Sequence, residues 1–113
     1  MHEMSLAEGV RELIEDAAAR EGFTRVKSVR VEIGELAGVE REAFAFCFDI
    51  VMAGGIADGA WLDIVATPGV GRCSVCGRET PLANVYDPCA HCGGFPVEVT
   101  AGCAMRVIDL EVE

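Results

Sequence analysis

Two identical cysteine spacings carry the clearest chemistry in this chain of 113 residues. Cys73 and Cys76 lie in the stretch CSVCG, and Cys89 and Cys92 lie in CAHCG. Each C-x-x-C turn can point two sulfurs at one ion, and the glycine that follows lets backbone N–H groups approach them. Four thiolates suit a tetrahedral zinc ion and leave no coordination position open. The spacing therefore predicts a structural zinc site, and zinc would supply much of the folding free energy of this small module.

The same four sulfurs also suit iron in a rubredoxin-like arrangement, and the spacing leaves this alternative open. Disulfides are less favoured, because the chain is expected to be cytoplasmic. His91, inside the second C-x-x-C, is predicted to be an exposed spacer, with a replacement ligand or a pH sensor as the alternative. Cys47 is predicted to pack as a small hydrophobic residue. Cys103 is predicted to be an idle thiol, with a spare metal ligand as the alternative.

The amino terminus offers a second, nitrogen-rich set of ligands. The chain begins MHEMSLAEGV, and a histidine in second place should prevent removal of Met1. The α-amine of Met1, the amide nitrogen of His2 and its imidazole can form consecutive five- and six-membered chelate rings, to which Glu3 can add an oxygen. Such a set approaches the square-planar geometry of Ni(II) and Cu(II). A merely solvated terminal histidine is the alternative, and the local pattern alone favours it.

Two helices are predicted around these ligands. Ser5 and Glu8 have the spacing of a capping box, and apolar residues follow at helical spacing, so the first helix is expected over 6–20 with the terminal residues preceding it. The second helix is expected over 40–53. Glu40 would then be a solvated acid favoured by the helix dipole, with an orienting or ligating role at the terminus as the alternative.

Three stretches have the apolar alternation of strands, namely 26–33, 60–66 and 105–112. The last of them cannot stand alone and is expected to pair with the other two. The predicted fold class is α+β, with a small three-stranded sheet, two helices and an inserted zinc-ribbon-like four-cysteine module. Residues 1–69 and 104–113 would form the α+β domain that carries the terminal ligands, and 70–103 the zinc-binding module.

Composition excludes several classes of function. The net charge of −10 repels phosphate backbones, so no nucleic-acid partner is expected. No apolar run approaches the roughly 18 residues that span a bilayer, and no signal peptide is visible, so we expect a cytoplasmic protein without a membrane partner. With only two histidines, a pair of nucleophile and base has few candidates. The chain is therefore not expected to be an enzyme.

Taken together, several stretches resemble the HypA/HybF family, the nickel metallochaperones of nickel–iron hydrogenase maturation. They are MHEMSLAEGV, VRVEIGELAGVEREAFAFCFDIV, ADGAWLDIVATPG and the two C-x-x-C turns, in the same order over essentially the whole chain. The resemblance implies that His2 is the essential nickel ligand and that the Met1 amine and Glu3 are further ligands. It also implies that the zinc ligands are Cys73, Cys76, Cys89 and Cys92.

The resemblance further implies Zn(II) as a structural cofactor and Ni(II) as a transient cargo. The implied partners are the GTPase HypB and the hydrogenase large-subunit precursor, and some family members also serve urease maturation. One departure is Cys103, which stands where a small or polar residue is expected. A zinc-ribbon interaction module without nickel delivery is the alternative function, and a redox protein with iron in the four-cysteine site is a third.

Overall fold

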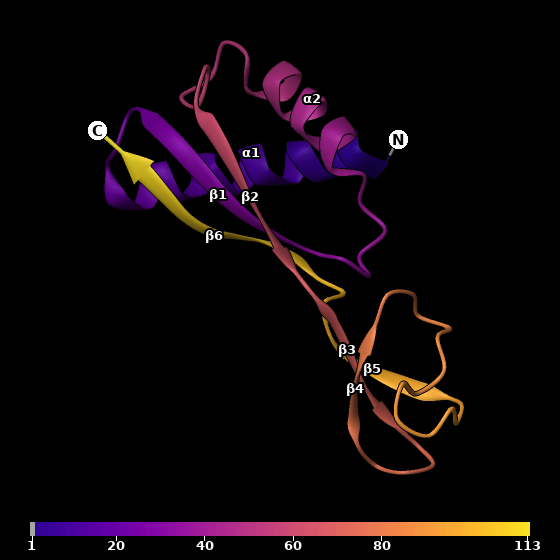
Figure 1. Ribbon diagram of the computed structural model, residues 1–113. Coiled ribbons are helices and arrows are strands. Elements are labelled where there is room, and N and C mark those ends of the chain that lie inside the picture. The colour runs from indigo at the N-terminus through magenta and orange to yellow at the C-terminus, as the bar shows by residue number, and fades with distance from the viewer. Residues whose placement is uncertain (1) are drawn as a thin grey trace. The chain divides into compact units, whose positions relative to one another are not determined.

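The computed structural model describes residues 2–113, which form two helices and six strands (Figure 1). In chain order the elements are α1 (His2–Glu21), β1 (Val26–Gly34), α2 (Arg41–Met52), β2 (Trp61–Thr67), β3 (Gly69–Cys73), β4 (Glu79–Leu82), β5 (Val97–Ala101) and β6 (Met105–Val112). The strands make two three-stranded sheets, of order β2-β1-β6 and β4-β3-β5. Neither helix among the described residues is long and apolar enough to cross a membrane.

The chain divides into two compact units. The first unit combines the chain up to Val31 with Val39–Ile64 and Val107–Glu113, and the second unit combines Glu32–Gly38 with Val65–Arg106. The α+β class with two helices, a three-stranded sheet and a four-cysteine module is confirmed. The predicted domain boundaries at 69/70 and 103/104 stay a prediction.

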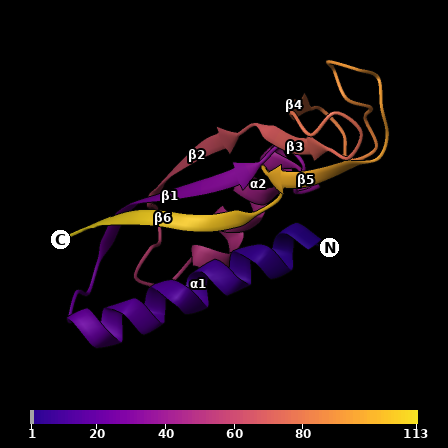
Figure 2. The ribbon, with the colours of Figure 1, turned by 90° about the horizontal axis from the view of Figure 1, so that it is seen from below.

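In the first unit, one face of β1 is buried and the other is open. Val29 and Val31 are fully buried, whereas Arg30 between them is exposed and pairs with Asp63 at 3.0 Å and Asp109 at 3.4 Å. These ion pairs mark the open face of the sheet. The helices α1 and α2 pack on the buried face, because alternation along β1 makes that face apolar. Figure 2 shows β1 between β2 and β6, as the predicted return of the last strand requires.

The predicted start of the first helix is wrong. The helix α1 begins at His2, so Ser5 lies inside the helix and cannot be its N-cap. Glu3 favours this earlier start, since an acid in the first turn offsets the positive end of the helix dipole. His2 and Glu3, two of the predicted ligands, are therefore part of the first helical turn and do not precede the helix.

The second unit has a sheet that the sequence analysis did not predict. Strand β3 pairs antiparallel with both β4 and β5. The small core beneath these strands contains Cys73, Leu82, Cys89 and Val97, and Leu36 from the turn after β1 packs against it. The four-cysteine module is thus completed by a side chain that lies more than thirty residues earlier in the sequence.

The turn that carries Leu36 is held between two other segments of the second unit. Its backbone N–H donates to the carbonyl of Gly102 at 2.8 Å, and the N–H of Glu35 donates to the carbonyl of Thr67 at 2.9 Å. A Cβ at Gly34 would collide with the carbonyl of Gly102. The glycines here therefore serve close backbone contact.

Gly69→Ala is expected to destabilise the protein by about 1–3 kcal/mol, because overpacking forces backbone shifts. A Cβ at Gly69 would lie 2.5 Å from the Leu82 carbonyl oxygen and 2.6 Å from Leu36 Cγ. The matched control is Gly9→Ala in α1, where a Cβ meets nothing within 4 Å and helix propensity should add up to about 1 kcal/mol. Urea unfolding and amide hydrogen exchange of β3 measure both effects. Equal stability of the two variants contradicts this packing argument.

Candidate metal centres

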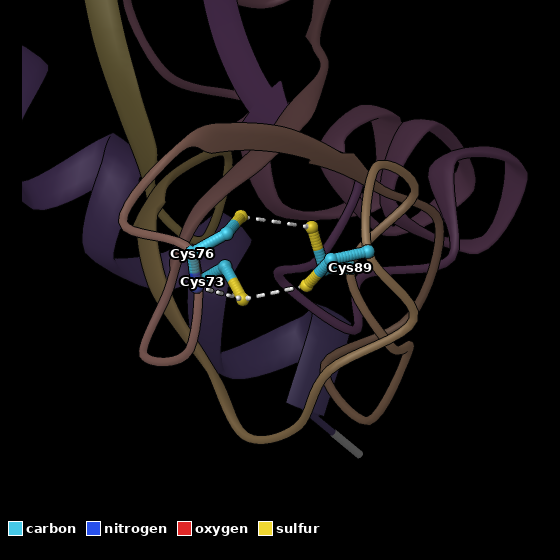
Figure 3. Close-up of side chains that lie close together, drawn as sticks. Cys73, Cys76 and Cys89 are labelled. Carbon is cyan, nitrogen blue, oxygen red and sulfur yellow. Dashed lines mark hydrogen bonds between the residues drawn. The ribbon is translucent and has the colours of Figure 1, made fainter.

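Four cysteine sulfurs of the second unit meet at one point. Cys73 ends β3, Cys76 lies in the turn toward β4, and Cys89 and Cys92 lie in the loop before β5. All four sulfurs lie within 4.8 Å of one another, with 3.6 Å between Cys73 and Cys92 and 3.8 Å between Cys76 and Cys89 (Figure 3). A tetrahedron with metal–sulfur bonds of about 2.3 Å places its sulfurs about 3.8 Å apart. The cluster therefore fits structural zinc, and all six cysteines are free thiols.

Backbone N–H groups surround the sulfurs as the spacing predicts. The N–H groups of Val75 and Cys76 donate to Cys73 Sγ at 3.3 and 3.4 Å, and the N–H of His91 donates to Cys89 Sγ at 3.3 Å. Such donors stabilise thiolates and orient them toward a metal ion. Each C-x-x-C turn is closed by a glycine in the left-handed region, with φ of 73° at Gly77 and 72° at Gly93.

The pKa values of three of these thiols, Cys73, Cys89 and Cys92, are shifted in different directions. The N–H groups of Cys76 and Val75 lower the pKa of Cys73, and those of Cys92 and His91 lower the pKa of Cys89 to about 6. The Gly94 N–H lowers the pKa of Cys92, but its contacts with the neighbouring thiols, Cys73 first, raise it to about 11. The cluster therefore cannot carry four thiolates at neutral pH by itself, and a dication would supply the missing compensation.

Two contacts attach the second C-x-x-C turn to β4. Thr80, only 1% exposed, accepts a hydrogen bond at its Oγ1 from the N–H of Ala90 at 3.0 Å. The ring Nε2 of His91 lies 3.1 Å from the carbonyl oxygen of Glu79, and the side chain is exposed, as predicted. The sequence alone did not reveal this role of Thr80, because it depends on the burial of one face of β4.

The other two cysteines match the predicted environments. Cys47 is 6% exposed on α2, where it packs as a small hydrophobic residue, and Cys103 is exposed. Among residues 2–113, the four-cysteine cluster is the only group of three or more metal-ligating side chains. Neither Cys47 nor Cys103 is part of it.

At the other end of the chain, His2 and Glu3 form a close pair. His2 Nδ1 lies 3.9 Å from Glu3 Oε2, and their side chains are 54% and 16% exposed. The same Glu3 oxygen accepts a hydrogen bond from the backbone N–H of Glu40 at 3.1 Å. The hydrogen bond from the Glu40 N–H lowers the pKa of the Glu3 carboxyl group most. A hydrogen bond from the backbone N–H of Glu3 itself lowers it further. Met1 lies outside the described residues.

Glu40 thus has two roles at the start of α2. Its carboxylate is the N-cap and accepts from the N–H of Glu42 at 3.2 Å, while its own backbone N–H holds Glu3. The backbone donor was missed by sequence reasoning, which considered only the Glu40 carboxylate. No residue type encodes such a donor, so only the fold reveals it.

The chain matches known proteins over its full length. A family model described as "Hydrogenase/urease nickel incorporation, metallochaperone, hypA" matches residues 1–112. The hydrogenase maturation factor HypA of Albidiferax ferrireducens is 52% identical over 113 residues, the whole of both chains. That of Azoarcus sp. is 54% identical over 110 residues and covers 97% of this chain and 96% of its own.

Two solved structures share the fold. The solution structure of the Ni metallochaperone HypA from Helicobacter pylori has a TM-score of 0.72 and 26% identity, covering 97% of this chain and 96% of that one. A second solution structure, of a HypA protein, has a TM-score of 0.72 and 28% identity, covering 100% of this chain and 97% of that one. The chain belongs to the HypA family of hydrogenase and urease nickel-incorporation metallochaperones.

Proposed function

We propose that this chain binds Ni(II) at its amino terminus and delivers it during hydrogenase maturation. Membership of the HypA family supports a role in nickel incorporation. The observation that carries the terminal site is the His2–Glu3 pair in the first turn of α1, with Glu3 held by the N–H of Glu40. The four cysteines, Cys73, Cys76, Cys89 and Cys92, would hold the resident zinc ion.

The geometry of the pair supports this ligand set. Two donors that each lie about 2.1 Å from one ion can be at most about 4.2 Å apart. The 3.9 Å between His2 Nδ1 and Glu3 Oε2 is within this limit. The first N–H groups of a helix have no acceptor within the helix, so the His2 amide nitrogen could bind Ni(II) and release its proton to solvent. The Met1 amine would complete the chelate.

Charge at this helix end decides how firmly the ion is held. A cation is disfavoured at a helix N-terminus, because the unpaired N–H groups carry partial positive charge. The ionised Glu3 carboxylate offsets this effect. An exposed site with one compensating acid suits a cargo that must be released, whereas the four thiolates of the second unit suit an ion that stays.

The proposed recipients follow from the family. Nickel would pass to the hydrogenase large-subunit precursor in the cytoplasm, with the GTPase HypB as a partner in delivery, and urease maturation is a second destination in the family description. We infer that no catalytic step is involved, since neither the thiolate cluster nor the His2–Glu3 pair joins a nucleophile to a base.

An extension before Met1 tests the terminal site directly. It converts the amine to an amide and removes one nitrogen ligand, so the affinity for Ni(II) is expected to fall by at least about tenfold. Calorimetric titration of protein with a native terminus provides the reference, and the same extension after Glu113 is the control. Equal affinity of all three proteins would show that the Met1 amine is not a nickel ligand.

A further inference from the structure

We propose that a hollow beside the sheet edge of the first unit receives an arginine side chain from a basic, amphipathic segment of a partner protein. This hollow lies between α2 and the start of β2 and has a volume of about 340 Å³. Its lining residues are Ala45, Asp49, Gly59, Ala60, Trp61 and Leu62. The proposal concerns a protein contact and does not depend on nickel binding.

Two of the residues that line this hollow, Asp49 and Trp61, are of types that bind a guanidinium group. Asp49 comes from α2, and no described cation lies within ion-pair distance of its carboxylate. Trp61 begins the edge strand β2 and is 81% exposed, an unusual state for the largest apolar side chain. An arginine can stack on an indole ring while its N–H groups donate to a carboxylate. The small, open hollow suits one long side chain better than a buried small molecule.

Apolar side chains continue the surface along α2. Phe46 and Ile50, one turn apart on the helix, are 69% and 51% exposed. Phe46 lies three positions before Asp49 and Ile50 one position after it, so the three residues share one side of α2. Exposed large apolar residues around a charged group are typical of a protein-binding surface, not of a solvated helix face. The partner segment should therefore carry apolar residues next to its arginine.

Charge identifies the partner as cationic. Residues 39–64, which contain the whole hollow, carry five acids and the single base Arg41. The first unit as a whole has 14 acids against six bases. A second copy of this chain would bring the same negative charge to the contact, which disfavours self-association. Electrostatic complementarity favours a basic segment and would accelerate the encounter.

The only tryptophan of the chain makes the test specific. Trp61 fluorescence is titrated in the full-length, zinc-loaded protein with an acetylated, amidated helical peptide that carries leucines on one face and one arginine beside them. Binding should shift the emission to shorter wavelength and saturate. Asp49→Asn should lower the affinity for the peptide by about fivefold. Replacing the peptide's arginine with citrulline should lower the affinity by a similar factor. Glu8→Gln, which removes another exposed acid, on α1, should leave the affinity unchanged.

Several results would overturn the proposal. They are an unchanged Trp61 emission with the parent protein, equal affinities for Asp49→Asn and the parent, and equal affinities for the arginine and citrulline peptides. Self-association of the parent that itself buries Trp61, measured by sedimentation, would assign the surface to a second copy instead. Circular dichroism and nickel titration of Asp49→Asn check the fold. Asp49 lies about 13 Å along α2 from Glu40, so nickel binding should match that of the parent.

Discussion

His2→Ala is expected to reduce the affinity for Ni(II) by at least about 100-fold. The substitution removes the imidazole, and with it one chelate ring and the donor that lies 3.9 Å from Glu3. Loss of an outer-shell group already costs about 10- to 100-fold in metal affinity, and loss of a ligand should cost more. Calorimetric titration of the protein with its native terminus measures the change. The fold should survive, since the His2 side chain is 54% exposed.

His91→Ala is the matched control, because His91 is the only other histidine and is also exposed. It should keep the parent affinity for nickel. Binding of the parent should weaken as the pH falls, since nitrogen ligands must be deprotonated to bind a metal ion. Equal nickel binding by His2→Ala and the parent would remove the chemical basis of the proposed terminal site.

Features set by local spacing could be predicted from the sequence. The two C-x-x-C turns place sulfurs and N–H groups within a few residues of each other, so the cluster needed only a short chain reversal to form. The alternation at Val29 and Val31 marked the buried face of β1 for the same reason. Each of these predictions depended on residues a few positions apart.

Features that depend on distant backbone could not be predicted. The contact of Glu3 with the N–H of Glu40 joins residues 37 positions apart and gives the terminal carboxylate its place. The true start of α1 was missed as well, because the Ser5–Glu8 pattern is a local signal for a helix start further along the chain. Leu36 lies in a turn outside every predicted element, and its packing on the core of the second unit has no local signal in the sequence.

Cys89→Ser is expected to reduce the affinity for zinc by more than about 100-fold and to unfold the second unit. Two of the four buried residues in its core, Cys73 and Cys89, are themselves among the proposed zinc ligands, so little apolar burial remains without the ion. A serine hydroxyl keeps its proton at neutral pH and replaces a thiolate poorly. Metal analysis and amide hydrogen exchange of β3, β4 and β5 measure the two effects.

The first unit should stay folded in this variant. Its core is built on Phe44, Phe48 and Ile14 and includes no residue of the four-cysteine cluster. Removal of zinc by a chelator should reproduce the loss of protection in β3, β4 and β5, whereas Cys103→Ser, which changes an exposed thiol outside the cluster, should retain zinc. A second unit that keeps its exchange protection after complete zinc removal would mean that Leu36, Leu82 and Val97 suffice as a core, because zinc binding and folding would then be separate events.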